Sequence, residues 1–299
     1  MSVAAAAIGS RRELVQRTAR RSLPRRQLMG RIVIALSVVA VIGAVAPLFA
    51  VLAYTVGRGI SSLSPDFFIN LPTPALVPGG GIANALIGSL IIDAIAAAMA
   101  IPLGVVMGLF LAEGRGRFAA GVRFGADVLV GMPSITVGLF AYAVVVIPTR
   151  QFSAFSASVA LAVLMLPVVM RTSEAAVRGV PTDLWEAGMA LGMRRARIAR
   201  AVILPAALPG LVTGALLATA RAVGESAPLL FTTAGNQFFQ LSPSQPMAAM
   251  PLVIYQNGLQ AYPDLQQRAW GTALVLVVVV LVLNLGSRLF AGRLRRYTR

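Results

Sequence analysis

The sequence contains no cysteine, no histidine and no lysine. Without cysteine it can form no disulfide bond, and without cysteine or histidine it lacks the ligands of the usual zinc sites. A nucleotide-binding P-loop requires a lysine that holds the β and γ phosphates, so this chain does not hydrolyse ATP by that machinery. Its serines have no histidine that could activate them. We therefore expect no catalytic residue, no metal and no cofactor on this chain; if ATP drives its function, a partner subunit binds the ATP and magnesium.

Charged residues are also scarce. They make up 12% of the 299 residues, whereas hydrophobic residues make up 58% and the mean hydropathy is +0.81. A water-soluble core of this size could not bury so much apolar surface. A bilayer core about 30 Å thick requires roughly 20 apolar residues per helix, and six runs meet this requirement: 32–56, 84–111, 125–147, 154–170, 205–232 and 269–290. The sequence therefore predicts an all-α integral membrane protein with six transmembrane helices.

All 26 basic residues are arginines, and their positions predict the topology. Eight precede the first predicted span, three lie between the second and third, six between the fourth and fifth, and five follow residue 287. Arg58, Arg150 and Arg268 fall on the opposite side, and Arg221 falls inside the fifth span. Because arginine is enriched in cytoplasmic loops, we expect both termini in the cytoplasm of a multi-pass cell-membrane protein. No aromatic residues interleave with the arginines, so nucleic acid is not an expected partner.

The first thirty residues form an arginine-rich arm. The apolar run that follows is longer than that of a signal peptide and lacks a small-residue cleavage site, so we expect a retained anchor. The sequence predicts a disordered cytoplasmic arm over 1–30, facing anionic membrane lipid, and one transmembrane domain over 31–299. Two segments, 57–83 and 234–268, are rich in proline, glycine and serine; we expect ordered external loops that could receive a soluble binding protein.

The long cytoplasmic loop 171–204 is predicted to form two short helices that meet at a glycine. Asp183 followed by Glu186 is an N-terminal capping signal, and Gly192 can adopt the left-handed conformation that ends a helix. A second helix then returns the chain to the membrane at Leu204 and Pro205. The loop would thus hold a compact helical pair below the bilayer.

This loop resembles the EAA loop of ABC-importer permeases, E-A-A-x3-G-x9-I-x-L-P. The matching residues are Glu186, Ala187, Gly188, Gly192, Val202, Ile203, Leu204 and Pro205, with Gly188 in place of the second alanine and Val202 in place of isoleucine. The resemblance implies the type I importer permease fold, with this loop acting as the coupling helix that seats in a groove of the ATP-hydrolysing subunit. An ordinary hairpin that only returns the chain to the membrane is the alternative.

Residues 220–231, Ala-Arg-Ala-Val-Gly-Glu-Ser-Ala-Pro-Leu-Leu-Phe, resemble the signature of the phosphate permeases within this family. Segments 78–84, 126–135 and 247–255 resemble the same proteins. The resemblance implies a permease subunit of an ATP-driven phosphate importer that forms half of a translocation path. It also implies four kinds of neighbour: a homologous second permease, two ATPase subunits, an extracytoplasmic phosphate-binding protein and membrane lipid.

Arg221 and Glu225 are the candidate pathway residues, with Ser226 beside them. An isolated charge at mid-membrane costs at least about 2.5–3.5 kcal/mol, so such residues usually face a bundle interior or a watery path. Four residues apart on a helix, the two side chains would share a face and pair. We expect Arg221 to bind phosphate oxygens bidentately, with Glu225 neutralising it when the path is empty and accepting the proton that phosphate carries and sulfate lacks. A structural ion pair that pins two helices is the alternative.

Other intramembrane positions carry weaker signals. Asp127 follows Arg123 by four residues, which predicts a local salt bridge. Asp93 is expected to make a structural hydrogen bond or to pair with an arginine, and Pro133 is expected to kink the third span. Two rival functions stay open: a permease for sulfate, molybdate or another oxyanion, and a non-transporting membrane scaffold that regulates an ATPase.

Overall fold

A computed structural model describes residues 2–114 and 116–297, and these residues form helices and connecting segments without any strand. They divide into a first unit that ends at Val56 and a second that begins at Gly57. Helix α1 (Ser2–Gly59) makes up the first unit, and its last residues, from Gly57, belong to the second. Helix α1 begins at Ser2, and the disorder expected of the arm 1–30 stays a prediction. Alanine, leucine, glutamine and arginine fill the arm, and all four are strong helix formers.

The second unit is built on four further long helices, α3 (Ala83–Glu113), α7 (Ala154–Arg178), α10 (Leu204–Ala222) and α13 (Pro263–Tyr297). Its short helices are α2 (Pro65–Ile69), α4 (Arg117–Gly131), α5 (Ser134–Ala141), α6 (Ile147–Thr149), α8 (Thr182–Ala190), α9 (Arg195–Ile198), α11 (Ala227–Thr232) and α12 (Met250–Gly258). A 3₁₀ turn covers Ile60–Ser62, and π-helical turns cover Tyr142–Val146 and Ala199–Ile203.

Five helical segments among the described residues are long and apolar enough to cross a membrane, and a sixth span is obtained if α4 and α5 are counted together. These two helices meet at an angle of 105°. Pro133 was predicted to kink this span, and the change of direction is larger than a kink because the helix ends at Gly131 and starts again at Ser134. Proline has no N–H to continue the helical ladder, and glycine is a poor helix former.

Helices α3 and α7 pack closely because small residues lie between them. A Cβ atom placed on Gly104 would lie 2.7 Å from the Cβ of Val169, and one placed on Gly108 would lie 2.5 Å from the Cβ of Ser173. Gly104 and Gly108 are four residues apart and therefore lie on one face of α3. This is the GxxxG arrangement that lets transmembrane helices approach each other.

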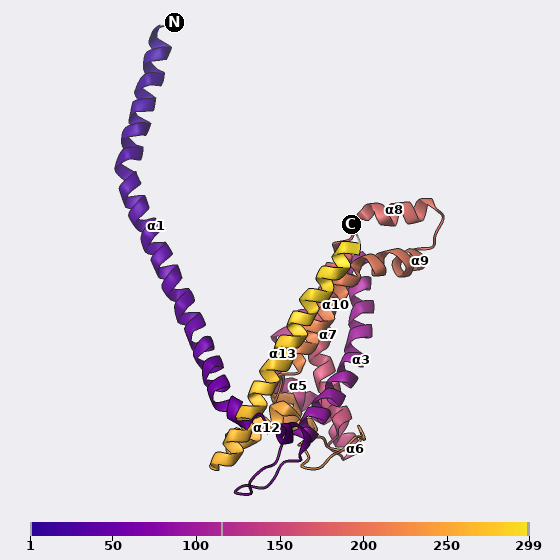
Figure 1. Ribbon diagram of the computed structural model, residues 1–299. Coiled ribbons are helices and arrows are strands. Elements are labelled where there is room, and N and C mark those ends of the chain that lie inside the picture. The colour runs from indigo at the N-terminus through magenta and orange to yellow at the C-terminus, as the bar shows by residue number, and fades with distance from the viewer. Residues whose placement is uncertain (1, 115, 298–299) are drawn as a thin grey trace. The chain divides into compact units, whose positions relative to one another are not determined.

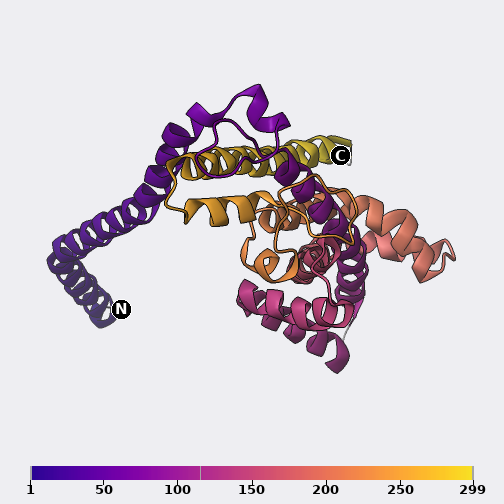
Figure 2. The ribbon, with the colours of Figure 1, turned by 90° about the horizontal axis from the view of Figure 1, so that it is seen from below.

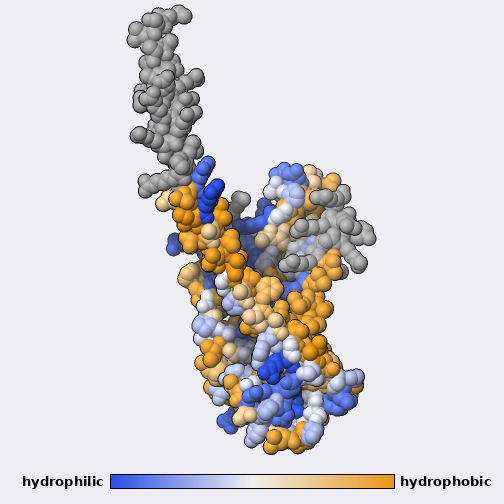
Figure 3. Space-filling view, turned by 60° about the vertical axis from the view of Figure 1, so that its left-hand side comes forward, coloured by the Kyte–Doolittle hydropathy of each residue, from blue (hydrophilic) through white to orange (hydrophobic). Residues whose placement is uncertain are grey.

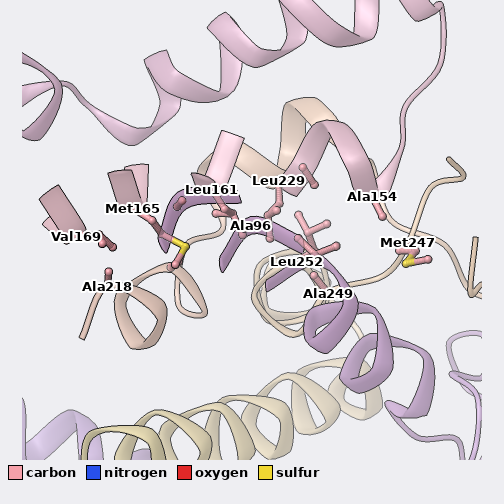
Figure 4. Close-up of a cluster of buried hydrophobic side chains, with 14 residues drawn as sticks. Ala96, Ala154, Leu161, Met165, Val169, Ala218, Leu229, Met247, Ala249 and Leu252 are labelled. Carbon is pink, nitrogen blue, oxygen red and sulfur yellow. The ribbon is translucent and has the colours of Figure 1, made fainter. Parts of the chain in front are cut away.

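The main core is formed where α3, α7, α10, α11 and α12 meet. Figure 4 shows side chains of this cluster, including Ala96 of α3, Leu161 and Met165 of α7, Ala218 of α10 and Leu229 of α11. All five are at most 3% exposed. The core joins the helix that carries Arg221 to the rest of the second unit.

Within the second unit, α3, α7, α10 and α13 run side by side, with α8 and α9 at one end and α6 and α12 at the other (Figure 1). From below, α12 lies alongside α13 (Figure 2). Hydrophobic side chains cover much of the helical surface, and hydrophilic residues gather at the end that carries α6 and α12 (Figure 3). Leu90 and Val106 of α3 and Val282 of α13 are exposed apolar side chains, as expected for helices that face lipid.

Candidate functional site

Arg221 lies in the last turn of α10 and its side chain is exposed. Helix α10 ends at Ala222, and the chain then turns at Val223 and Gly224, where the Gly224 N–H donates to the Arg221 carbonyl at 3.2 Å. Glu225 therefore follows the helix instead of continuing it. The predicted ion pair between Arg221 and Glu225 does not form, because the helical spacing on which it depended stops before Glu225.

Arg221 and Glu225 nevertheless line one cavity of about 100 Å³. The other lining residues come from α4, α5, α7 and the α4–α5 break: Leu129, Val130, Met132, Ser134, Leu164 and Val168. Apart from Arg221 and Glu225, none of these residues carries a charge. Within the described part of the chain, the Arg221 guanidinium forms no hydrogen bond and no ion pair. The cavity therefore contains a cation whose donors are free to bind an anion.

Ser226, the third predicted pathway residue, comes directly before α11 and is half-buried. Its carbonyl accepts a hydrogen bond from the Leu230 N–H at 3.3 Å. It does not line the cavity that holds Arg221 and Glu225. The structure thus brings two of the three predicted pathway residues together.

A charge cluster on α4 and α7 was missed by the sequence analysis. Glu174 of α7 has a side chain that is 6% exposed, and its carboxylate is 2.8 Å from Arg123 and 2.9 Å from Arg178, with Arg171 at 3.5 Å. The predicted salt bridge between Asp127 and Arg123 is therefore wrong. Arg123 of α4 pairs with Glu174 of α7 instead, and Asp127 pairs with Arg171.

The cluster also fixes the end of α3. Arg123 Nη2 donates to the carbonyls of Leu111 and Gly114, and Arg178 Nη2 donates to the Leu111 carbonyl at 3.3 Å. These carbonyls end a helix, where four carbonyls have no partner within the helix. Part of this cluster could have been predicted from the sequence. Glu174 follows Arg171 by three residues and precedes Arg178 by four, which is the spacing of ion pairs along a helix.

Asp93 behaves differently from the prediction. Its side chain lies in α3 and is 9% exposed. Within the residues that the structure covers, it makes neither a hydrogen bond nor an ion pair. Neither the expected structural hydrogen bond nor the expected arginine partner is therefore found among the described residues.

The segment 171–204 contains the predicted helix pair, α8 and α9. Helix α8 ends before Gly192, which has a φ of +73° and so occupies the left-handed region that favours glycine. The Gly192 N–H donates to Met189 O at 2.9 Å and the Met193 N–H to Gly188 O at 3.1 Å, a Schellman-type closure. The capping prediction is wrong: Pro181 is the N-cap residue, and Asp183 lies in the first turn of α8.

Packing explains the small residue at Gly188. A Cβ atom there would lie 2.8 Å from Ile198 Cγ1. Ile198 is fully buried in a cluster with Ile203 at the base of α10. Leu204 and Pro205 begin α10 directly after the π-helical turn, so α9 is continuous with the helix that carries Arg221.

The outer face of α8 is exposed. Glu186 and Ala187 are open to solvent, and Leu184, Met189 and Leu191 are exposed apolar side chains, with Leu191 80% exposed. Exposed apolar groups of this kind mark protein contact surfaces. The predicted coupling residues Glu186 and Ala187 therefore lie on a surface that a partner protein could cover, whereas Gly188, Gly192, Leu204 and Pro205 shape the loop that presents it.

Comparison with known proteins identifies the class. Residues 100–299 match the family described as "Binding-protein-dependent transport system inner membrane component". The chain belongs to this family. It is a multi-pass inner membrane protein, and as a permease component it is a transport subunit whose ATPase is a separate chain. The predicted resemblance to ABC-importer permeases is confirmed.

Individual relatives are more specific than the family, and two of them are phosphate transport permeases. The chain is 38% identical to the phosphate transport system permease protein PstA of Yersinia pestis, over 90% of this chain and 92% of that protein. It is 40% identical to PstA of Haemophilus influenzae, over 89% and 94% of the two chains. A bacterial alginate ABC transporter has a similar fold, with a TM-score of 0.64 and 13% identity over 93% of this chain and 96% of that one. The predicted type I importer permease fold is thereby confirmed.

Proposed function

We propose that this chain is the permease subunit of an ATP-driven importer of inorganic phosphate and forms half of the translocation path. The observation that carries the proposal is the unpaired, exposed Arg221, which shares a cavity with Glu225 at the break between α4 and α5. The phosphate transport permeases that the chain resembles support the choice of substrate.

Arg221 supplies the anion site. Its planar guanidinium presents five N–H donors in a fork that fits two phosphate oxygens, and it stays charged at any working pH. Because no carboxylate of the described residues holds it, the anion does not need to displace a partner. The Arg221 side chain is exposed in the single chain, so the site is shallow and exchangeable, as conduction requires.

Glu225 supplies a second, opposite charge in the same cavity. An ionised carboxylate only accepts hydrogen bonds. Phosphate near neutral pH still carries a proton that it can donate, whereas sulfate does not. Glu225 would therefore accept a hydrogen bond from phosphate and repel sulfate, which gives the site a preference that Arg221 alone cannot provide.

Coupling to ATP follows from the loop below α10. The exposed residues of α8 would seat in the ATPase subunit, and closure of that subunit would move α8 and α9 together because Gly188 packs on Ile198. The continuous path from α9 through the π-helical turn to α10 would carry the movement to Arg221.

The full transporter would contain further subunits. A homologous second permease would cover the exposed side chain of Arg221 and complete the path. Two ATPase subunits would bind ATP and magnesium, and an extracytoplasmic phosphate-binding protein would deliver substrate to the end of the unit that carries α6 and α12. Both termini and the α8–α9 loop would then face the cytoplasm, since arginines gather on that side.

The proposal is tested by uptake of radiolabelled phosphate and sulfate into vesicles that contain the reconstituted complex. The variant Arg221→Gln should lose phosphate uptake while the complex still assembles. Arg117→Gln removes an exposed arginine from the start of α4, away from the cavity, and should transport normally. Full phosphate uptake by Arg221→Gln would contradict the proposal, and wild-type uptake of sulfate in preference to phosphate would favour the permease for another oxyanion.

A further inference from the structure

The two external segments, 57–83 and 234–268, enclose a second and larger cavity. Its volume is about 630 Å³, and it lies between residues 72–81 of the first segment, Asn84 at the start of α3 and residues of the second segment. Many of its lining side chains are neutral hydrogen-bonding groups, among them Thr73, Asn84, Asn236, Gln256 and Gln260. No aspartate or glutamate lines it, and Arg268 is its one charged lining residue. The cavity therefore has room for a hydrated ion, and its single fixed charge is positive.

Arg268 is buried and forms no ion pair with any residue that the structure describes. It is 6% exposed, and its three hydrogen bonds go to neutral oxygens: Nη1 to the Thr73 carbonyl at 2.9 Å, and Nη2 to Thr73 Oγ1 at 2.7 Å and to the Gly79 carbonyl at 3.3 Å. At least two of its five N–H groups, including that of Nε, have no partner among the described residues. Buried charges are normally paired, so these free donors require an explanation.

The nearest acid does not supply the missing partner. Asp264 lies one turn earlier on α13, and its Oδ2 atom accepts a hydrogen bond from the Leu76 N–H at 2.9 Å. It does not line the cavity. Asp264 is close enough to offset part of the positive charge of Arg268. An anion in the cavity would accordingly be held weakly and could leave again.

The glycines of segment 78–84 wrap the chain around this arginine. Gly79 and Gly80 have φ values of +84° and +82°. A Cβ atom on Gly80 would lie 2.8 Å from Arg268 Nη2 and 2.5 Å from Thr73 Oγ1. Because the glycines have no side chain, the backbone of this segment can approach the Arg268 guanidinium closely. The site at Arg221 gives no reason for this glycine run.

We propose that this cavity is an oxyanion-binding vestibule in which Arg268 and neutral amide side chains hold a phosphate before it reaches Arg221. The inference rests on the proposed phosphate transport. Arg268 provides the charge, and Gln256, whose side chain makes no hydrogen bond within the described residues, provides an additional donor. The two arginines would then form successive weak sites, which is the arrangement that conduction needs.

The absence of cysteine makes a direct test possible. Gln260→Cys places a thiol in the cavity. The hydrogen bonds of Gln260 among the described residues use its backbone: its N–H donates to the Asn257 carbonyl at 3.2 Å, and its carbonyl accepts from Gln266 Nε2 at 2.7 Å. In the reconstituted complex, the rate at which this thiol reacts with a small neutral maleimide is measured against inorganic phosphate, with chloride at matched ionic strength. Phosphate should slow the reaction saturably and chloride should not. Equal effects of the two anions, or none, would overturn the inference.

Three further variants in the Gln260→Cys background locate the binding groups. Arg268→Gln should abolish protection, whereas Arg221→Gln should keep it. Gln256→Leu leaves the contacts of Arg268 intact and should raise the half-protecting phosphate concentration roughly tenfold, as expected for one lost hydrogen bond to a charged group; this variant decides the matter if Arg268→Gln fails to assemble. Unchanged protection in Gln256→Leu and Arg268→Gln would overturn the vestibule.

Wild-type uptake separates this inference from the proposed function. If the wild-type complex imports phosphate but phosphate gives no protection of Gln260→Cys, the vestibule is wrong and the proposed function stands. If the wild-type complex imports no phosphate, the proposed function fails, whether or not phosphate slows the maleimide reaction of Gln260→Cys.

Discussion

The Nε atom of Arg123 on α4 lies 2.8 Å from the Oε1 atom of Glu174 on α7. Glu174 is the buried member of this pair, with 6% of its side chain exposed against 24% for Arg123. The same carboxylate contacts Arg171 and Arg178. Arg123 and Arg178 also donate hydrogen bonds to the Leu111 carbonyl near the end of α3. One glutamate thus holds three helices together at the end of the unit that carries α8 and α9.

Replacing Glu174 by glutamine should destabilise the protein. Three arginines would lose their shared acceptor, and breaking a buried ion pair costs roughly 3–5 kcal/mol; partial exposure of the arginines reduces this to about 1–3 kcal/mol. The apparent melting temperature of the purified complex in detergent should fall. Asp127→Asn is the matched control because Asp127 is 60% exposed, and a drop of equal size in that variant would contradict the account.

The GxxxG face of α3 gives a second prediction. Gly104→Ala and Gly108→Ala should each destabilise the protein by about 1–3 kcal/mol, because the added methyl groups meet α7 at 2.7 Å and 2.5 Å. Gly125→Ala on α4 meets nothing within 4 Å and should stabilise by up to about 1 kcal/mol through helix propensity. Thermal unfolding in detergent compares the three variants. Equal stability of Gly108→Ala and Gly125→Ala would show that α3 and α7 are not in close contact.

Gly192 should control coupling. Its φ of +73° is strongly unfavourable for a β-branched residue, so Gly192→Val should distort the α8–α9 turn and let the complex hydrolyse ATP without importing phosphate. Gly192→Asn should be milder, because asparagine tolerates this conformation. Gly179→Ala, in the same loop at a φ of −74°, is the control. ATP hydrolysis and uptake are measured on the same vesicles, and wild-type uptake by Gly192→Val would rule out the coupling role.

Glu225 should set selectivity. Glu225→Gln removes the carboxylate that accepts the proton of phosphate and supplies an amide donor instead, so phosphate uptake should fall and sulfate uptake should rise. Competition between the two labelled anions in vesicles measures the ratio. Asp66→Asn removes one negative charge from the exposed α2 and should leave the ratio unchanged. An unaltered ratio in Glu225→Gln would remove Glu225 from the selectivity mechanism.

The sequence predicted the membrane class, the approximate positions of the apolar segments and the helix pair within 171–204, because hydropathy and a left-handed glycine are local properties. It placed the ends of elements less well. The predicted fifth span continued to Thr232, but α10 ends at Ala222, since Gly224 and Pro228 interrupt the helix. That early end is also why Arg221 and Glu225 share a cavity and form no ion pair.

The remaining differences depend on contacts between distant segments. Glu174 binds Arg123 across 51 positions of sequence, and Arg268 binds Thr73 across 195. Neither spacing follows a helical period, so a local pattern could not predict either contact. The structure places Arg221 and Glu225 in one cavity without the predicted ion pair and leaves Ser226 outside it; the role of these residues in the pathway stays a prediction.

The most direct test of the central claim is whether phosphate reaches Arg221. Ser134→Cys places a thiol in the cavity that Arg221 lines, in a chain without other cysteines. During turnover of the reconstituted complex, a water-soluble thiol reagent should modify this cysteine, phosphate should slow the modification, and Arg221→Gln should remove the effect of phosphate. A thiol that never reacts, or protection by phosphate that is unchanged in Arg221→Gln, would contradict the claim that Arg221 borders the anion path.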